Sequence, residues 1–119
     1  IARKKTDRAM YERKIPIDAD CGVTVFQAVV GAKWKPYLIS CLTKGIRRPS
    51  EFQKAITGAD KRVLAKQLRE LEQMGIIRKK VYPVIPQKVE YFLTDLGESV
   101  VPVIRAMDDW GNAHRRIVE

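Results

Sequence analysis

The chain has 119 residues, 45% apolar and 31% charged, a balance typical of one small globular domain and not of a disordered chain. Its 23 lysines and arginines against 14 acidic residues give a net charge of +9, which points to a polyanionic partner such as nucleic acid. No apolar run approaches the roughly 20 residues of a membrane span, and two cysteines are too few for a disulfide framework, so we expect a cytoplasmic protein without a membrane partner.

The beginning of the chain predicts an arm followed by a helix. Residues 1–20 are polar, and Pro16 prevents a helix from continuing through them, so we expect an N-terminal arm with about two helical turns. Asp20 is the expected N-cap of the next helix, and Gly31 is its expected C-terminal stop. The apolar face of this helix should hold Val23, Phe26 and Val30.

A second helix has apolar side chains every three or four residues. Pro36 is compatible with its first turn, where the missing N–H is not needed, and Gly45 should end it. Residues 46–48 predict a very short strand. The stripe expected to be buried comprises Trp34, Tyr37, Leu38, Cys41 and Leu42.

Pro49 and Ser50 open a third, short helix. Ser50 and Gln53 have the spacing of a capping box, in which each side chain bonds the backbone N–H of the other residue. The inward face of this helix should hold Phe52, Ala55 and Ile56, and a turn should follow over residues 57–59.

The fourth helix is expected over residues 60–74, with Asp60 as its N-cap and Gly75 as its stop. Its apolar line is one residue wide per turn and consists of Leu64, Leu68 and Leu71. The polar side carries Arg62, Lys66, Arg69 and Gln73, with Lys61 and Ala65 beside them. A helix of this kind packs on one side and presents cations on the other.

The pattern then changes from helix to strand. Residues 76–82 and 88–93 are β-prone, and the two prolines between them keep the loop extended, which predicts a hairpin with a long tip. Thr94 can cap a final helix that runs close to the C-terminus. The order of elements predicts an α+β, mainly helical fold of the winged helix-turn-helix type.

The fourth helix is the candidate recognition helix, because the major groove of B-DNA, about 12 Å wide, admits such a helix. Residues near the start of a recognition helix reach base edges, and later ones reach phosphates. We therefore expect base-edge contacts from Lys61, Arg62 and Ala65. Lys66 and Arg69 are expected to contact phosphates. The alternative is an ordinary amphipathic helix with a solvated basic face.

The distribution of charge along the chain favours the DNA-binding interpretation. Residues 33–88 contain 14 basic and 4 acidic side chains, whereas residues 89–119 contain 3 basic and 6 acidic ones. A surface that only needs to be soluble mixes the two signs. Further DNA-binding candidates lie around the hairpin and before the third helix, namely Lys79, Lys80, Gln87, Lys88, Arg47 and Arg48.

A repeat of 3.5 residues in the last helix predicts pairing with a second helix. It begins at Leu96, and the expected dimer interface is formed by Val100, Val103, Met107, Trp110, His114 and Ile117. Part of this face must pack on the domain's own core, but the distal half of so long a helix needs a partner. We expect a homodimer on an inverted-repeat operator, with an arm (1–20), a DNA-binding domain (21–93) and a dimerisation helix (94–119).

Several motifs occur in a characteristic order between residues 21 and 111. They are Gly31-Ala32-Lys33-Trp34, Arg47-Arg48-Pro49-Ser50-Glu51-Phe52, Gln67-Leu68-Arg69-Glu70-Leu71-Glu72, Val81-Tyr82-Pro83, Pro86-Gln87-Lys88-Val89-Glu90-Tyr91, Leu93-Thr94 and Leu96-Gly97. These motifs resemble the HxlR-type family of bacterial transcriptional regulators. The resemblance implies a homodimeric winged helix-turn-helix protein that binds operator DNA and dimerises through N- and C-terminal helices. Gly22, Pro49 and Asp60 depart from the usual proline, aromatic residue and serine of that family.

Cys21 is the candidate redox-sensing residue. It lies in the first turn of a predicted helix, where unpaired N–H groups and the helix dipole favour a thiolate, while Asp18 and Asp20 oppose it. Many regulators that this chain resembles sense oxidants or electrophiles through a cysteine at the matching position, so the resemblance implies the same role here. The alternative is a half-buried structural thiol. Cys41 is expected to be an inert core residue.

The sequence contains no pattern typical of catalysis or of metal or cofactor binding. The single histidine, His114, falls on the repeat of the last helix, and neither Cys/His metal spacing nor a glycine-rich phosphate loop nor a serine nucleophile motif occurs. We therefore expect no enzyme, metal or cofactor. The alternative to operator binding is a winged-helix module that docks protein or RNA, although such a module needs neither the basic helix face nor the 3.5-residue repeat.

Overall fold

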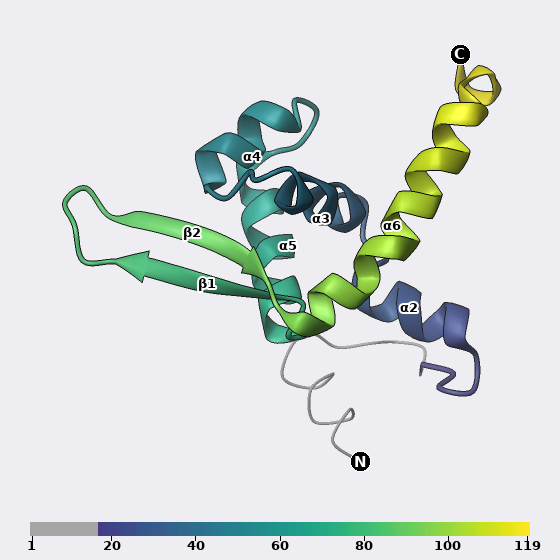
Figure 1. Ribbon diagram of the computed structural model, residues 1–119, viewed down its shortest axis with the longest axis horizontal. Helices are drawn as coiled ribbons and strands as arrows, with labels where there is room; N and C mark the ends of the chain where they lie inside the picture. The colour runs from purple at the N-terminus through teal and green to yellow at the C-terminus, as the bar shows by residue number, and fades with distance from the viewer. Residues whose placement is uncertain (1–16) are drawn as a thin grey trace.

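The structure is a computed structural model that describes residues 17–119 (Figure 1). The expected N-terminal arm of residues 1–20 lies almost wholly outside this range. In chain order the elements are α2 (Gly22–Val30), α3 (Lys35–Thr43), α4 (Pro49–Ala55), α5 (Lys61–Gln73), β1 (Ile77–Tyr82), β2 (Lys88–Leu93), α6 (Asp95–Ala113) and the 3-10 helix η1 (Arg115–Val118).

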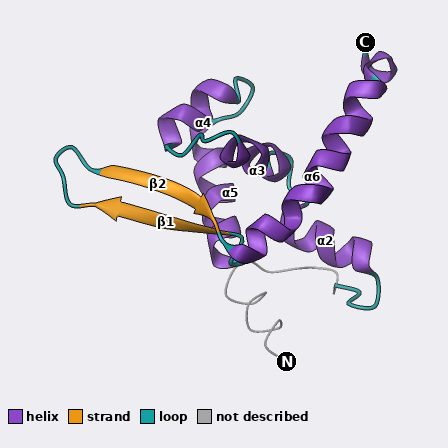
Figure 2. Cartoon of the chain, viewed as in Figure 1, coloured by secondary structure: helices purple, strands orange, loops and turns teal. Residues whose placement is uncertain are grey.

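Helices α3, α4 and α5 form the body of the molecule, the β1–β2 hairpin projects from it as a wing, and α6 runs away on the other side (Figure 2). The two strands are antiparallel, with Ile77 opposite Leu93 at the base and Tyr82 opposite Lys88 at the tip. The described residues are thus mainly helical with one small antiparallel sheet, which confirms the predicted fold class.

Helix α3 occupies the centre of the hydrophobic core, because it packs against α4, α5, α6 and β2. Its Leu38 and Ile39 are fully buried, as are Phe52 of α4 and Leu71 of α5. The ring of Tyr91 in β2 lies 6.3 Å from that of Phe52, measured between ring centres. Complete burial of an apolar side chain contributes about 1.5–3 kcal/mol to folding, so these contacts hold the helices in place.

Most of the predicted helix caps and C-terminal stops are confirmed. The side chain of Asp60 caps α5 by accepting a hydrogen bond of 2.7 Å from a backbone N–H, and Thr94 caps α6 in the same way at 3.0 Å. Gly45 and Gly75 follow α3 and α5 with φ angles of +86° and +79°. Only glycine adopts this left-handed backbone at no steric cost, which explains why both helices stop there.

The start of α2 differs from the expected one. Asp18 Oδ1 accepts a hydrogen bond of 3.1 Å from the Asp20 N–H, which closes a local turn. The helix therefore begins one residue later than predicted, with Cys21 as the N-cap residue. The prediction that Asp20 caps α2 is wrong because this turn already holds its backbone.

The predicted capping box of α4 is also wrong. Pro49 is the first helical residue, which makes Arg48 the N-cap and Glu51 the third helical residue. Glu51 Oε1 accepts hydrogen bonds of 3.0 Å from the backbone N–H groups of Arg47 and Arg48, and these bonds lower the pKa of the Glu51 carboxyl. The cap is therefore formed by a carboxylate and not by the predicted pair of Ser50 and Gln53.

Residues 46–48 do not form the expected strand. A single backbone bond of 2.9 Å joins the Tyr91 N–H to the carbonyl of Arg47, and the chain turns into α4 directly afterwards. One such bond does not make a strand pair, so the sheet has two strands in the described part of the chain.

Two side chains predicted to be buried are exposed. Tyr37 keeps 46% of its surface because its hydroxyl lies at the protein surface, where it donates a hydrogen bond of 3.1 Å to the carbonyl of Ala55. Val23 keeps 70% of its surface on the outer side of α2. The apolar periodicity of both helices thus extends further than the core of one chain can cover.

Helix α6 starts in close contact with the base of the wing. A Cβ atom placed at Gly97 would lie 2.1 Å from the carbonyl oxygen of Ile76, much closer than any side chain tolerates. The Thr94 N–H donates a hydrogen bond of 3.1 Å to the same carbonyl. Backbone contacts therefore fix the direction in which α6 leaves the hairpin.

Candidate nucleic-acid interface

Two buried polar contacts position α5 against α3. Gln67 Oε1 of α5 accepts a hydrogen bond of 3.0 Å from the Trp34 N–H at the start of α3. One turn further along α5, Glu70 Oε1 lies 3.0 Å from Lys35 Nζ. Neither contact could be predicted from the sequence, because glutamine and lysine are mostly exposed, yet Gln67 and Lys35 are buried here.

The face of α5 that points away from the core carries the expected cations. Leu64, Leu68 and Leu71 are buried as predicted. The five recognition-helix candidates are all exposed, namely Lys61, Arg62, Ala65, Lys66 and Arg69. In the described part of the chain no carboxylate oxygen lies within 4.0 Å of a side-chain nitrogen of Lys61, Arg62, Lys66 or Arg69, so these charges are unpaired.

A groove of about 610 Å³ separates α5 from the wing. It is lined by Arg48 and Ser50 at the start of α4, Lys61 and Ala65 of α5, and Gln87 and Lys88 of the wing. The structure thus brings together predicted DNA-binding residues from three elements that are separated in the sequence. We call this feature the α5–wing groove.

The hairpin register places the two predicted wing lysines on opposite faces of the sheet. Lys79 pairs with Tyr91, which packs on the core, and therefore lies on the α5 side. Lys80 pairs with Glu90 on the other side, where its Nζ lies 4.8 Å from the centre of the Tyr82 ring. These two lysines therefore cannot contact one DNA surface from the same face of the wing.

A polar and aromatic cluster surrounds Tyr82 near the wing tip. The Tyr82 hydroxyl donates a hydrogen bond of 2.6 Å to Glu90 Oε1, and this bond raises the pKa of the phenol. Lys88 Nζ lies 4.5 Å from the centre of the same ring, and Arg48 Nε lies 3.9 Å from Glu90 Oε2. The cluster holds basic side chains at the edge of the α5–wing groove.

Arg47 does not line the α5–wing groove. Its guanidinium donates a hydrogen bond of 3.3 Å to the Tyr91 carbonyl and lies 4.7 Å from the centre of the Phe92 ring. Phe92 is on the face of the sheet that carries Lys80. The neighbouring Arg48 is exposed and does line the groove, so the structure separates two residues that the sequence analysis treated together.

The structure divides the predicted dimer interface of α6, which we also call the dimer seam, into a buried and an exposed part. Val100 is buried in the core of its own chain, next to Val101 and Ile104. Val103, Met107 and Trp110 are 43%, 48% and 61% exposed. The proximal seam therefore belongs to the monomer, whereas the distal half of α6 presents an apolar stripe.

The last two seam residues lie beyond or at the end of α6. The imidazole of His114 stacks on the Trp110 indole with ring centres 4.4 Å apart, and Ile117 falls in the 3-10 helix η1, where the 3.5-residue repeat no longer applies.

None of the described helices combines the length and the apolar character that crossing a bilayer requires.

The two cysteines have different surroundings. Cys21 is half-buried at the N-cap of α2, where hydrogen bonds from the Thr24 side chain and backbone lower the pKa of its thiol. Cys41 is buried in α3, and burial raises the pKa of its thiol. In the described part of the chain, His, Cys, Asp and Glu side chains form no cluster that fits a metal ion.

A helix-turn-helix followed by a basic two-stranded wing defines the class of winged helix-turn-helix transcription regulators. Comparison with known protein families agrees, because residues 29–118 match the HxlR-like helix-turn-helix family. The chain belongs to this family, as its motifs predicted.

Relatives and solved structures support the assignment. The chain is 40% identical over 112 residues to the uncharacterised HTH-type transcriptional regulator YdeP of Bacillus subtilis, covering 89% of this chain and 88% of YdeP. The reduced form of the redox regulator HypR aligns with a TM-score of 0.77 at 37% identity, over 82% of this chain and 97% of HypR. The oxidised form of HypR aligns with a TM-score of 0.76 at 38% identity, over 79% of this chain and 97% of HypR. The protein is a transcription regulator of the helix-turn-helix type, and its relatives are regulators and not enzymes.

Proposed function

We propose that the protein binds double-stranded operator DNA as a homodimer in the cytoplasm. The observation that carries this proposal is the exposed, unpaired basic face of α5 beside the α5–wing groove. A face with several unpaired cations binds the phosphate backbone and releases its counterions. The proposed domain organisation is an N-terminal arm (1–20), a DNA-binding domain (21–93) and a dimerisation helix (94–119).

The position of each cation on α5 suggests what it contacts. Lys61, Arg62 and Ala65 lie in the first turns of the helix, where a recognition helix reaches base edges in the major groove. Lys66 and Arg69 lie further along and reach phosphates. Arg48, Lys79, Gln87 and Lys88 support them from the α4 start and the wing. Lys88 lies on the same sheet face as Lys80, but at the wing tip, where it lines the groove. Arg47 and Lys80 are not among the residues that line the groove and would reach only a DNA backbone that wraps around the wing.

The distal half of α6 is the proposed dimer interface. The exposed stripe of Val103, Met107 and Trp110 continues toward His114 and Ile117, and contiguous apolar side chains of this kind mark an interaction site. A two-fold dimer would place its recognition helices about 34 Å apart, one turn of DNA, so the operator is expected to be an inverted repeat.

Cys21 is the proposed redox- or electrophile-sensing residue. Hydrogen bonds from Thr24 favour its thiolate, which is the form that reacts with oxidants and electrophiles. Two structures similar to this chain are of a regulator described as a redox regulator, in its reduced and oxidised forms. The proposal predicts that modification of Cys21 releases the DNA.

A fluorescence anisotropy titration tests the proposal with the full chain. The probe is a duplex from the promoter region next to the protein's own gene, and the control is a duplex of the same length and composition in scrambled order. Specific binding should exceed random binding by at least about 10³-fold. Equal affinity for both duplexes would contradict operator binding and favour a winged-helix module that docks protein or RNA.

A further inference from the structure

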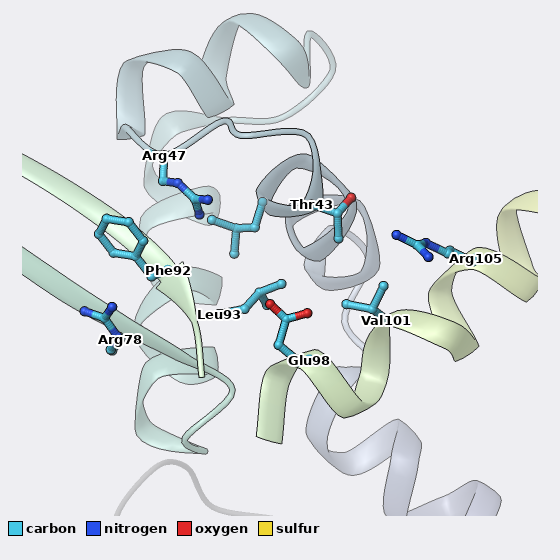
Figure 3. A pocket seen from close by; sticks show the side chains of 9 residues that line it. Thr43, Arg47, Arg78, Phe92, Leu93, Glu98, Val101 and Arg105 are labelled. Carbon is cyan, nitrogen blue, oxygen red and sulfur yellow. The ribbon is translucent and has the colours of Figure 1, made fainter. Parts of the chain in front are cut away.

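A second cavity, of about 300 Å³, lies between the wing and α6. It receives Arg47 from the segment before α4, Arg78 from β1 and Arg105 from α6, with Glu98 at the start of α6 (Figure 3). No residue lines both this cavity and the α5–wing groove, so the two cavities are separate. We call this second cavity the arginine hollow.

The charges in the arginine hollow are unbalanced. The guanidinium carbons of Arg47 and Arg78 both lie 4.7 Å from the centre of the Phe92 ring, so one aromatic side chain holds two cations. In the described part of the chain, no carboxylate oxygen lies within 4.0 Å of a guanidinium nitrogen of any of the three arginines. Three guanidiniums against the single carboxylate of Glu98 leave a net charge of +2. Like charges gathered in a partly enclosed space repel one another, and a bound anion would relieve the repulsion.

We propose that the arginine hollow binds a small anion with two or more carboxylate or phosphate groups. A guanidinium donates two parallel hydrogen bonds to either group, which makes arginine the preferred residue for such recognition. Two of the cations flank Phe92, and Arg105 extends toward Thr43 from the α6 side, so a ligand with anionic groups at both ends fits best (Figure 3). The volume is at the lower end of the range for small-molecule sites, about 300–1,000 Å³.

The floor of the hollow is apolar and preformed. Leu42 and Val101 are buried beneath it and belong to the core. The hydroxyl of Thr43 donates to the Ser40 carbonyl at 2.6 Å, which fixes its orientation. A ligand would therefore meet a rigid base, with long arginine side chains as the adjustable part.

The position of the hollow gives binding a structural consequence. An anion held by Arg78 and Arg105 would join β1 to α6. Under the function proposed above, this joins the DNA-contacting wing to the dimerisation helix. That consequence rests on the proposed function, whereas binding of the anion itself does not.

Isothermal titration calorimetry of the full chain tests the proposal directly. Citrate and pyrophosphate are the probes, at a constant ionic strength of about 0.15 M. At least one of them should bind saturably, with one site per chain and a Kd below about 1 mM. Saturation by citrate alone assigns a carboxylate ligand, and saturation by pyrophosphate alone assigns a phosphate ligand. Absence of saturable binding by both probes overturns the proposal.

Three variants separate a built site from general charge attraction. Arg105→Gln should weaken binding about tenfold or more, because a charged hydrogen-bond donor is lost. Arg116→Gln makes the same charge change in η1, outside the hollow, and should change the Kd by less than about twofold. Glu98→Gln removes the one opposing carboxylate and should tighten binding about threefold or more, a gain that misfolding cannot produce.

Two results would contradict the inference. Equal weakening by Arg105→Gln and Arg116→Gln would show that only net charge matters. A loss of affinity for a short DNA duplex, caused by Arg105→Gln in the absence of citrate and as large as the loss for citrate, would make the hollow a contact for DNA phosphates instead.

Discussion

Lys35 Nζ and Glu70 Oε1 form an ion pair of 3.0 Å in which the side chains keep only 4% and 14% of their surface. The pair joins the start of α3 to the C-terminal part of α5. It therefore fixes the angle between the two helices near the point where the basic face of α5 ends. The adjacent bond between Trp34 and Gln67 strengthens the same junction.

Removal of Lys35 should destabilise the fold strongly. Lys35→Met leaves the Glu70 carboxylate buried without its partner, which costs about 3–5 kcal/mol of unfolding free energy. The double variant Lys35→Met/Glu70→Leu should regain most of this loss. Urea denaturation followed by circular dichroism measures the effect. The control is Arg48→Ala, which breaks the half-exposed pair with Glu90 and should cost less than about 1 kcal/mol. Equal losses for Lys35→Met and the control would contradict a structural role of the buried pair.

Arg62→Ala should reduce both affinity and sequence discrimination. A side chain that reads a base edge contributes about 1–3 kcal/mol to specific binding, so the operator should lose more affinity than scrambled DNA. Lys66→Ala, one turn further along the same face, should weaken both duplexes equally and reduce the salt slope by about one. Anisotropy titrations at several salt concentrations distinguish the two patterns. If Arg62→Ala affected both duplexes in the same proportion, its assignment to base edges would be wrong.

Trp110→Glu should convert the dimer to a monomer. A carboxylate in the proposed seam would be removed from water on association, and that desolvation outweighs any gain from apolar contact. Light scattering at micromolar concentration measures the mass, with Lys54→Glu on the surface of α4 as a matched control that should stay dimeric. A wild-type protein that is monomeric under these conditions would refute the homodimer.

The thiol of Cys21 should react at lower pH than an ordinary cysteine. Its lowered pKa means that the thiolate forms below the usual value of about 8.5, so the alkylation rate should rise at a lower pH. Thr24→Val removes the hydroxyl that lowers the pKa most, and should shift the profile toward higher pH. The measurement uses a Cys41→Ser background, so that only one thiol reacts.

The link to DNA requires a second experiment on Cys21. The Cys21 thiolate adds to a ring carbon of a quinone: a carbon–sulfur bond forms, the ring C=C π bond breaks, and its electron pair moves to a carbonyl oxygen that takes a proton from water. This hydroquinone thioether should release the operator from the wild type. Cys21→Ser should keep the operator bound under the same treatment. Quinone-induced release that persists in Cys21→Ser would remove Cys21 as the sensor.

Local sequence signals were sufficient for most elements of the fold. Apolar spacing located α3 and α5, and Asp60, Thr94, Gly45 and Gly75 mark helix ends because each acts on its own neighbouring backbone. The error at α4 arose because the position of Pro49 decides which residue becomes the N-cap. A capping pattern alone does not contain that information.

Features that depend on distant parts of the chain could not be predicted. The burial of Gln67 depends on a backbone N–H 33 residues away. The arginine hollow depends on three elements that meet only in the folded chain, and the separation of Lys79 from Lys80 requires the strand register. For the candidate site, the sequence therefore predicted the residues of α5 but not which wing residues share their side.

Under the proposed dimeric binding of an operator, the contact between Gly97 and the Ile76 carbonyl would limit the spacing of the half-sites. In a dimer joined through α6, the distance between the two α5 helices is set by the connection between the DNA-binding domain and α6 in each subunit. Because the backbone of α6 packs closely on the Ile76 carbonyl at Gly97, we expect each connection to resist bending there toward half-sites at another spacing. A regulator built in this way tolerates changes in the bases between its half-sites more readily than the insertion or deletion of a single base pair.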